Sequence, residues 1–531
     1  MLLCRQEWNT YMCSAPESGI IMVRVVATFA LNGINGIPVF VEATHNGTSP
    51  EPRTNIIGLP DTAVKEAMGR VQAAAKSSHI SLFGGSNTVN LAPADVKKEG
   101  SSFDLPILLS LIDITKHSLP DLDGKCFAGE LSLTGEVRSI NGALSMALEA
   151  KRRGYREIYL PEMNAAEASA ADGIDVYPVR TVSQLYSHLT GGIQIEKTQF
   201  DPISFSGETL INAADFADVK GQDAAKKALE IAAAGLHNVL MIGPPGSGKS
   251  MLASRLPSIL PPLSVSEAIE TTQIHSVAGI LPGYSQLVTK RPFRSPHHSI
   301  SVAGLAGGGK SPRPGEISLA HGGVLFLDEL PEFDRSAMEV LRQPLEERKI
   351  NITRVSGSVC FPAAFILVCA MNPCRCGYFG HPTHPCSCSD TSRRSYVSKI
   401  SGPLLDRIDI QLEIPPLDFS ELSQRTLSEP SSAIRARVMK AREFAAKRFG
   451  DPAMANGFMK SAELRKYCSL DDAGTALMKR AFDALSLSAR SYDRILRVAR
   501  TIADFDGSDD IKTPHIALAL QLRSLDRKYF T

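Results

Sequence analysis

GPPGSGKS, residues 243–250, decides the fold of this 531-residue chain. The octapeptide matches GxxxxGK[ST] and lies between a predicted buried strand, residues 237–243, and a helical pattern, which is the context of a phosphate-binding loop. Glycines there let backbone N–H groups close around phosphate oxygens, and the helix N-terminus adds a favourable dipole. The alternative is a Gly/Pro turn whose lysine does not bind phosphate. The nucleotide-binding residues predicted from this loop are Gly243, Pro244, Pro245, Gly246, Ser247, Gly248, Lys249 and Ser250.

The loop and a later acidic pair together predict ATP hydrolysis. Lys249 is expected to reach the β- and γ-phosphates, and Ser250 to ligate Mg²⁺. An apolar run at residues 324–327 ends in Asp328 and Glu329. A carboxylate at the tip of a core strand can hold magnesium through water, and the next one can deprotonate the attacking water. Strand ends often carry Asp, so the acidic pair indicates ATP hydrolysis only because the phosphate loop is also present.

Asn372 follows a further apolar run, residues 365–371, that is typical of a buried parallel strand. From the end of that strand, Asn372 could hydrogen-bond the γ-phosphate or the lytic water between the two sites above. A turn-forming Asn before Pro373 is the alternative that the residues leave open.

The rest of the chain divides where its pattern changes. Short strands alternating with Ala-rich amphipathic helices predict an α/β domain from residue 22. The segment 215–235 is interpreted as one helix that opens a second α/β domain with a parallel core sheet. Helical periodicity dominates after Pro416. The predicted divisions are residues 1–21 (unstructured leader or extension), 22–192 (α/β domain), 193–210 (polar linker), 211–415 (nucleotide-binding domain) and 416–531 (helical domain).

Composition excludes several classes of protein. Hydrophobic residues make up 43% of the chain and charged residues 21%, as in ordinary globular proteins. Lys+Arg 57 against Asp+Glu 56 gives a net charge of +1, which excludes binding of nucleic acid or anionic membrane through bulk charge and leaves only local patches. No apolar stretch predicts a membrane span, and the N-terminus lacks a secretory pattern, so a cytoplasmic protein is expected.

Two closely spaced cysteine pairs predict a metal site. Ten cysteines in so long a chain are too sparse for a disulfide scaffold. Two CxC pairs nine residues apart could place four thiolates around one Zn²⁺, and four closed ligands would make it structural. Free thiols in a loop are the alternative. The predicted ligands are Cys374, Cys376, Cys386 and Cys388, with His381 and His384 between the pairs.

Several motifs resemble those of the AAA+ ATPases, and within them the ComM/YifB-type magnesium-chelatase-like family. The resemblance implies a ring, usually a homo-hexamer, with ATP and Mg²⁺ held between subunits. It runs in order over about residues 215–523 in the motifs GPPGSGKS, RSPHHSIS, PRPGEISLAHGGVLFLDELPEF, LRQPLEER, AMNPC, GPLLDRIDI and SARSYDRILRVARTIADF.

The resemblance also assigns roles by position. Arg407, in LLDRID, looks like the arginine finger that reaches the neighbouring subunit's ATP. Arg490 looks like sensor 2, with Arg494 one turn on as the rival. Guanidinium groups offset charge on the transferring phosphoryl, although each could also be a surface or ion-paired residue. By position, Lys249 and Ser250 correspond to Walker A, Asp328 and Glu329 to Walker B, and Asn372 to sensor 1.

Three segments are candidates for contact with DNA. Residues 348–361 alternate and contain Ser-Gly-Ser, which predicts a hairpin, and in the resembled clade a hairpin there points into the ring pore. Lys349 and Arg354 could then contact DNA phosphates, which position a nucleic acid without reading its sequence. Residues 291–309, with a His-His pair, are a second pore candidate, and residues 433–449 are the densest basic run. Ordinary exposed charges are the alternative for each.

The N-terminal domain has its own resemblance. Residues 127–154 are similar to the C-terminal domain of Lon proteases, which has the ribosomal S5 domain 2-like fold. That family uses a Ser–Lys pair in which an unprotonated lysine activates the hydroxyl. Ser102 lies near the serine position, but Leu144 occupies the position of the lysine. The resemblance therefore implies a non-proteolytic Lon-like domain.

These observations predict a P-loop AAA+ core with a parallel sheet, an N-terminal S5 domain 2-like α/β domain and a C-terminal helical lid. The function they favour is a ring-forming ATPase that couples ATP hydrolysis to DNA remodelling, as a helicase or branch-migration motor in recombination or natural transformation, with recombination proteins as further partners. The alternatives are a chelatase-type motor acting on a protein partner and a Lon-like ATP-dependent protease.

Overall fold

The chain divides into two structural units. They are Met1–Phe200 with Gly279–Gln286, and Asp201–Ala278 with Leu287–Thr531. The leader predicted at residues 1–21 lies outside the described residues. The computed structural model describes residues 24–45, 53–82, 85–116, 119–200, 214–284, 286–309, 312–354, 357–416, 428–485, 487–523, 525 and 529.

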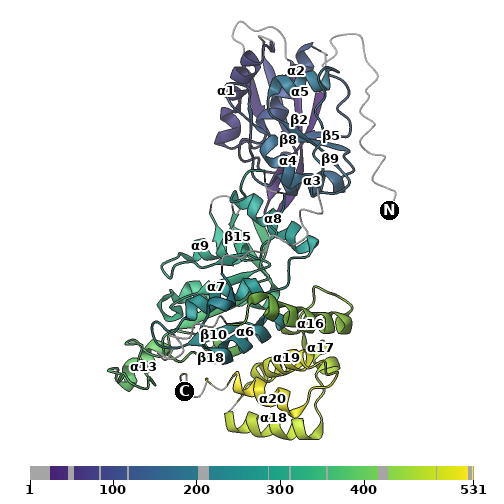
Figure 1. Ribbon diagram of the computed structural model, residues 1–531. Helices are drawn as coiled ribbons and strands as arrows, with labels where there is room; N and C mark the ends of the chain where they lie inside the picture. The colour runs from purple at the N-terminus through teal and green to yellow at the C-terminus, as the bar shows by residue number, and fades with distance from the viewer. Residues whose placement is uncertain are drawn as a thin grey trace. The chain divides into compact units, whose positions relative to one another are not determined.

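The first unit, labelled from α1 to β9 in Figure 1, is built on a mixed seven-stranded sheet. The order of its strands is β3-β4-β2-β1-β5-β8-β9. Its strands are β1 (Arg24–Asn32), β2 (Asn35–His45), β3 (Thr54–Ile57), β4 (Asn87–Ala92), β5 (Lys125–Phe127), β8 (Glu157–Pro161) and β9 (Asp175–Val179), and β6 (Glu130–Leu131) pairs with β7 (Val137–Arg138) beside it. Its helices are α1 (Thr62–Ser77), α2 (Asp104–Lys116), α3 (Ala143–Arg152), α4 (Glu162–Ala168) and α5 (Val182–Leu189). The predicted alternation of strands and amphipathic helices is confirmed.

Residues 193–200, which the sequence assigns to a linker, are packed on the first unit. The Thr198 N–H donates to the carbonyl of Val176 in β9 at 2.8 Å, and Ile195 is buried. Lys197 forms an ion pair with Asp175 at 2.9 Å. Residues 201–213 lie outside the described residues.

The second unit contains a five-stranded parallel sheet of order β11-β14-β17-β10-β18. The strands are β10 (Val239–Ile242), β11 (Phe293–Arg294), β14 (Val324–Leu327), β17 (Ile366–Met371) and β18 (Ile410–Glu413). Every residue of β10, β14 and β17 is buried, as expected of a parallel sheet covered on both faces. The apolar runs predicted as core strands are therefore confirmed, with β17 lying between β10 and β14.

The helix predicted over residues 215–235 is wrong in its first half. Phe216–Asp218 form a single 3₁₀ turn (η1), and α6 begins only at Asp223 and ends at Gly235. Gly221 and Gln222 lie between them with φ of 56° and 57°, which an α-helix does not tolerate. The other helices around this sheet are α7 (Lys249–Ile259), α8 (Val265–Ala278), α9 (Val302–Ala306), α10 (Glu316–Leu319), η2 (Leu330–Glu332), α11 (Arg335–Val340), α12 (Arg342–Glu347), α13 (Asp390–Val397) and α14 (Gly402–Leu405), and β12 (Gly307–Gly308) pairs with β13 (Arg313–Pro314).

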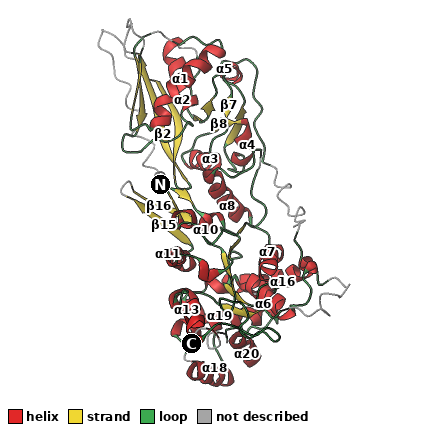
Figure 2. Cartoon of the chain, turned by 90° about the vertical axis from the view of Figure 1, so that its left-hand side faces the viewer, coloured by secondary structure: helices red, strands yellow, loops and turns green. Residues whose placement is uncertain are grey.

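The hairpin predicted within residues 348–361 is confirmed. β15 (Lys349–Arg354) pairs antiparallel with β16 (Gly357–Pro362), and Figure 2 shows the two strands side by side. Lys349 and Arg354 are both exposed on it.

Helices alone form the C-terminal part of the second unit (Figure 1). They share a hydrophobic core with the parallel sheet, to which Ile434 and Val498 contribute alongside Val239. The helices are α16 (Ser431–Phe449), η3 (Asn456–Phe458), α17 (Ser461–Tyr467), α18 (Asp472–Leu485), α19 (Ala489–Phe505) and α20 (Thr513–Gln521). The α/β fold class with a parallel core sheet and a helical C-terminal region is thus confirmed. Within the described residues, none of the helices combines the length and the apolar character needed to cross a membrane.

Candidate functional site

Three predicted motifs meet at one edge of the parallel sheet. The phosphate loop follows β10, Asn372 follows β17 and Asp328 follows β14. Because these three strands are parallel neighbours, their carboxyl ends lie at the same edge, which is where open α/β sheets bind ligands.

The glycines of the loop have two different roles. Gly246 and Gly248 have φ of 76° and 88°, and a Cβ on either would meet nothing within 4 Å. These two glycines are needed for backbone conformation, and they leave an open concavity in front of the first turn of α7. Gly243 is needed for space, since its Cβ would lie 2.3 Å from the carbonyl oxygen of Ile414.

The Lys249 ammonium is buried in the loop without a carboxylate beside it. Its Nζ donates to the carbonyls of Gly243 and Pro244, both at 2.8 Å, and lies 3.3 Å from Asn372 Oδ1. All of these partners are neutral, and no ion pair of Lys249 occurs among the described residues. Burial lowers the pKa of Lys249, and the more distant Asp328 opposes that shift. A buried cation with only neutral neighbours fits an anionic ligand such as a phosphate.

Ser250 and Asp328 bring two hard oxygen ligands together. The Ser250 Oγ donates to Asp328 Oδ2 at 2.7 Å, although 78 residues separate them. The other carboxylate oxygen accepts from the N–H of Glu329 at 3.0 Å. A hydroxyl and a carboxylate oxygen at this spacing suit Mg²⁺ held together with phosphate oxygens. The donor set therefore fits the ATP and Mg²⁺ that the motifs imply.

Glu329 adopts a left-handed conformation, with φ of 53°, directly after β14. Its side chain is 56% exposed, and its Oε2 lies 3.5 Å from Nδ1 of His298. The His298 ring packs on that of His297, with centroids 4.0 Å apart. Sequence reasoning placed this His-His pair in a pore segment and missed its contact with the acidic pair, for which the sequence carries no local signal.

Arg407 lies away from solvent in this chain. Its side chain is 5% exposed, forms an ion pair with Glu346, and donates to the carbonyl of Pro403 at 2.5 Å. Glu346 itself is half-exposed, so the pair lies at the surface edge of the unit. The structure does not bring Arg407 to the nucleotide residues of its own chain.

The two candidates for sensor 2 have different environments. Arg494 donates to Asp409 Oδ1 at 2.5 Å and to the carbonyl of Arg407 at 3.0 Å, and both Arg494 and Asp409 are largely buried. Arg490 is exposed in the first turn of α19, and the described residues offer it no hydrogen-bond or ion-pair partner. Arg494 therefore holds α19 to the start of β18, whereas Arg490 is available to a ligand.

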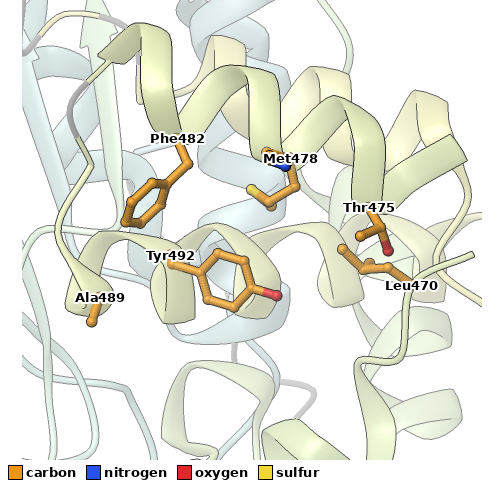
Figure 3. Close-up of a pocket in the computed structure, with 7 residues that line it drawn as sticks. Leu470, Thr475, Met478, Phe482, Ala489 and Tyr492 are labelled. Carbon is orange, nitrogen blue, oxygen red and sulfur yellow. The ribbon is translucent and has the colours of Figure 1, made fainter. Parts of the chain in front are cut away.

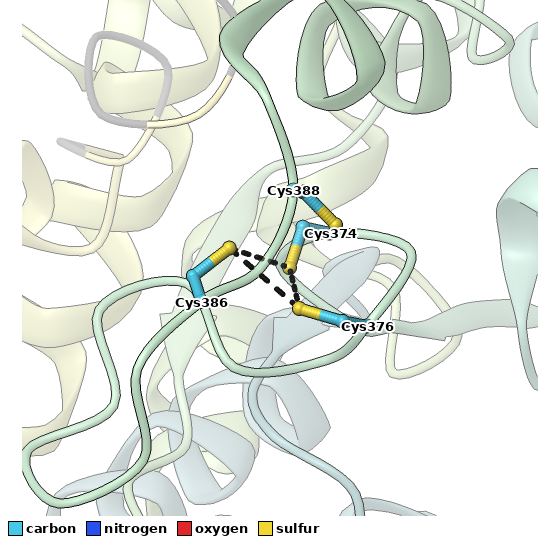
Figure 4. Close-up of side chains that lie close together, drawn as sticks. All are labelled: Cys374, Cys376, Cys386 and Cys388. Carbon is cyan, nitrogen blue, oxygen red and sulfur yellow. Dashed lines mark hydrogen bonds between the residues drawn. The ribbon is translucent and has the colours of Figure 1, made fainter.

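The four predicted metal ligands converge (Figure 4). Cys374 Sγ lies 3.3 Å from Cys376 Sγ and 3.6 Å from Cys386 Sγ, and all four sulfurs lie within 4.8 Å of one another. Zn–S bonds of about 2.3 Å in a tetrahedron require S···S distances of about 3.8 Å. The backbone N–H of Tyr378 first, and then Cys374, the backbone N–H of Ser387 and Cys388, lower the pKa of Cys376 to about 5. The cluster could hold a metal, and the two intervening histidines are not part of it.

Two other features contain none of the nucleotide residues. A mostly apolar pocket lies between α18 and α19, where Phe482 and Met478 face Tyr492 (Figure 3).

In the first unit, Leu144 is fully buried in α3, and the carbonyl of Ser102 accepts from the N–H of Gly129 at 2.9 Å. A buried leucine cannot supply the base that a Ser–Lys mechanism needs.

Comparisons with known proteins give consistent results over nearly the whole chain. The family model "Subunit ChlI of Mg-chelatase" matches residues 41–164, "Magnesium chelatase, subunit ChlI" residues 215–422, and "Magnesium chelatase, subunit ChlI C-terminal" residues 428–523. Competence protein ComM of Haemophilus influenzae is 41% identical over 90% of this chain and 93% of its own length. YifB of Escherichia coli is 40% identical over 95% and 97%. A mitochondrial Lon protease homologue of Candida albicans is 31% identical over 108 residues, which are 19% of this chain and 10% of that protein.

Proposed function

The chain belongs to the ComM/YifB-type magnesium-chelatase-like family of AAA+ ATPases, and we propose that it is a ring-forming motor that couples ATP hydrolysis to the remodelling of DNA. The observation that carries the proposal is the assembled nucleotide site, in which Ser250 meets Asp328 at 2.7 Å and Lys249 meets Asn372 at 3.3 Å. The DNA substrate is supported by likeness to a competence protein over nearly the whole chain. Natural transformation, with recombination proteins as partners, is the setting we propose.

Each nucleotide-site residue has a separate task in this proposal. Lys249 binds the β- and γ-phosphates, and Ser250 and Asp328 hold Mg²⁺. Glu329 accepts the proton of the attacking water, and Asn372 orients that water beside the γ-phosphate. When bound, Mg²⁺ offsets negative charge on the phosphates.

Assembly into a homo-hexamer would bring a neighbouring subunit's arginine to this site. We propose Arg407 as that residue, which requires its guanidinium to leave Glu346 and Pro403. This change of partners is favourable only if the phosphates of the neighbouring subunit's ATP replace both contacts, because a buried guanidinium without partners is costly. Arg407 would then report whether a neighbour has bound ATP.

Arg490 and Arg494 give a matched test of the sensor 2 assignment. Arg490→Ala is expected to slow ATP hydrolysis about 10-fold to 100-fold, the worth of a hydrogen bond to a charged group, at unchanged thermal stability. Arg494→Ala removes the partner of buried Asp409 and is expected to cost about 3–5 kcal/mol of unfolding free energy. Phosphate release and thermal melting measure the two effects. Slower hydrolysis without melting in Arg494→Ala, but not in Arg490→Ala, would reverse the assignment.

The β15–β16 hairpin is the better supported of the DNA-contacting segments. Its Lys349 and Arg354 are exposed, and neither forms an ion pair among the described residues. On α16, by contrast, Arg437 pairs with Glu230 and Glu429, and Arg448 pairs with Asp504. Arg442 donates to the carbonyls of Met454 and Pro452. Three of the six basic residues on α16 are therefore bonded within the chain.

Strand displacement and branch migration on forked and four-way DNA junctions test the DNA part of the proposal. The variant Lys349→Ala/Arg354→Ala is expected to lose most unwinding, and the slope of log affinity against log salt should fall by about 1 for each DNA phosphate that the variant no longer neutralises. Its DNA-independent ATP hydrolysis should not change. The matched control is Lys440→Ala/Lys447→Ala, which removes two exposed charges from α16.

Two outcomes would favour other functions. ATP hydrolysis without unwinding of any junction would contradict a DNA motor and favour a chelatase-type ATPase acting on a protein partner, the activity that the family models' description suggests. Casein cleavage that Ser102→Ala abolishes would instead support an ATP-dependent protease, against the buried Leu144. We also propose that the four-cysteine cluster holds one Zn²⁺.

A further inference from the structure

We propose that the four-cysteine cluster, with one zinc ion bound, is a brace that shapes the nucleotide site from behind the phosphate loop. The inference rests on the proposed function, because it assigns the metal a task in binding ATP. It concerns the loop of residues 373–389, which joins β17 to α13. The first end of this loop contacts the nucleotide site directly, the second end is tied to α13, and the cysteines bring the two ends together.

The cluster has the geometry of a closed structural site. The three shortest S···S distances are 3.3, 3.6 and 3.6 Å, close to the edge of about 3.8 Å of a zinc tetrathiolate. Two ligands come from each end of the loop: Cys374 and Cys376 from the first, Cys386 and Cys388 from the second. A single ion therefore closes the loop, which restricts the conformations open to both ends.

The first end of the loop packs against the phosphate loop. Gly377 has φ of 86°, and its N–H donates to the carbonyl of Cys374 at 3.0 Å, in a turn between the first ligands and the rest of the loop. A Cβ on Gly377 would lie 2.6 Å from Cδ of Pro245. Ordinary contact begins near 3.4 Å, so only glycine lets this turn lie against Pro245.

The same end also carries the proposed sensor. Asn372 lies two residues before Cys374, which is fully buried. The amide oxygen of Asn372 is 3.3 Å from Nζ of Lys249. Fixing Cys374 at the metal therefore limits how far Asn372 can move from the phosphate loop.

The second end of the loop returns to the same place through α13. The carbonyl of Cys388 accepts from Nη1 of Arg393 at 3.2 Å, which ties the metal loop to the first turns of α13. On the last turn of α13, burial raises the pKa of the Tyr396 hydroxyl, and the nearby backbone N–H of Asn372 opposes that shift.

These contacts connect the metal cluster to the nucleotide site through Gly377 at the first end of the loop and to α13 at the second. Without the metal, thiolates this close would repel one another, and the two ends of the loop, including the turn at Gly377, would be free to separate. We expect a more mobile phosphate loop and weaker binding of ATP, because ordering that loop around the nucleotide then costs conformational entropy.

The double variant Cys386→Ser/Cys388→Ser tests the metal. It is expected to lose the one zinc per chain that mass spectrometry of the purified wild-type protein should detect, and to bind a fluorescent ATP analogue about tenfold more weakly, which corresponds to about 1.4 kcal/mol. Amides of residues 243–250 should exchange hydrogen faster. Cys360→Ser is the matched control, since Cys360 is an exposed cysteine outside the cluster.

Gly377→Ala tests the contact with Pro245 without touching a ligand. It should keep its zinc and still bind the ATP analogue about tenfold more weakly, since the added Cβ displaces the loop that it meets. Unchanged zinc content in the double cysteine variant, or wild-type affinity for the analogue in either variant, would overturn the brace. A wild-type protein that neither binds nor hydrolyses ATP would instead contradict the proposed function.

Discussion

Replacement of Glu329 by Gln is expected to leave ATP bound and to slow its hydrolysis about 100-fold to 10,000-fold, the usual contribution of a general base. Glutamine keeps the length and the hydrogen-bonding oxygen of the side chain, but it cannot take a proton from water. Because Lys249, Ser250 and Asp328 are untouched, affinity for ATP should change little. Steady-state phosphate release and binding of a fluorescent nucleotide measure the two effects separately.

Glu332→Gln is the matched control for that experiment. Glu332 lies three residues further on, is also partly exposed, and pairs with Lys399 rather than facing the nucleotide site. Its neutralisation changes the net charge by the same amount and should leave hydrolysis within about twofold, as for most surface substitutions. If Glu329→Gln hydrolysed ATP at the wild-type rate, another group would have to be the base.

The nucleotide site could be predicted from the sequence because its signals are local. The phosphate loop, Asp328 and Asn372 each directly follow a short, wholly apolar run. Parallel strands end at one edge of their sheet, so three such runs place three polar groups together. The sheet order then puts β17 between β10 and β14, which explains why Asn372 lies 3.3 Å from Lys249.

The arginines show what the sequence could not provide. Arg490 and Arg494 lie one turn apart on the same helix, and nothing in their neighbourhood along the chain tells them apart. Arg494 is occupied because Asp409, 85 residues earlier, lies against α19. Arg407 is likewise paired with Glu346, 61 residues away. A charge is visible in the sequence, but its partner depends on tertiary packing.

Backbone conformation was the other source of error. Gln222 is an ordinary helix-forming residue, yet it has φ of 57° before α6 and ends the continuity that the apolar pattern predicts. Helix propensity is a weak preference, and tertiary contacts outweigh it here. The same limit applies to the metal loop, where Gly377 is required by a contact with Pro245 that is 132 residues away along the chain.

Replacement of Lys249 by Ala is expected to weaken the binding of ATP as well as its hydrolysis, unlike the change at Glu329. The loss of a charge-assisted hydrogen bond to phosphate should weaken binding at least about 10-fold to 100-fold, or about 1.5–3 kcal/mol. Hydrolysis should fall further, about 1000-fold or more, because the same ammonium also stabilises charge on the transferring phosphoryl. Equilibrium nucleotide binding and phosphate release measure these two effects.

Thermal unfolding decides whether the loss at Lys249 is local. Its Nζ bonds to the carbonyls of Gly243 and Pro244 at 2.8 Å, so alanine leaves two acceptors without that donor and could cost about 1–3 kcal/mol of stability. Lys249→Arg keeps the charge but cannot fit a planar guanidinium into a site built for a compact ammonium, and should also lose hydrolysis. A folded Lys249→Ala protein that bound ATP normally would mean that the buried ammonium bonds only to its own loop. Weaker binding by a folded Lys249→Ala protein would instead support a direct contact of the ammonium with phosphate.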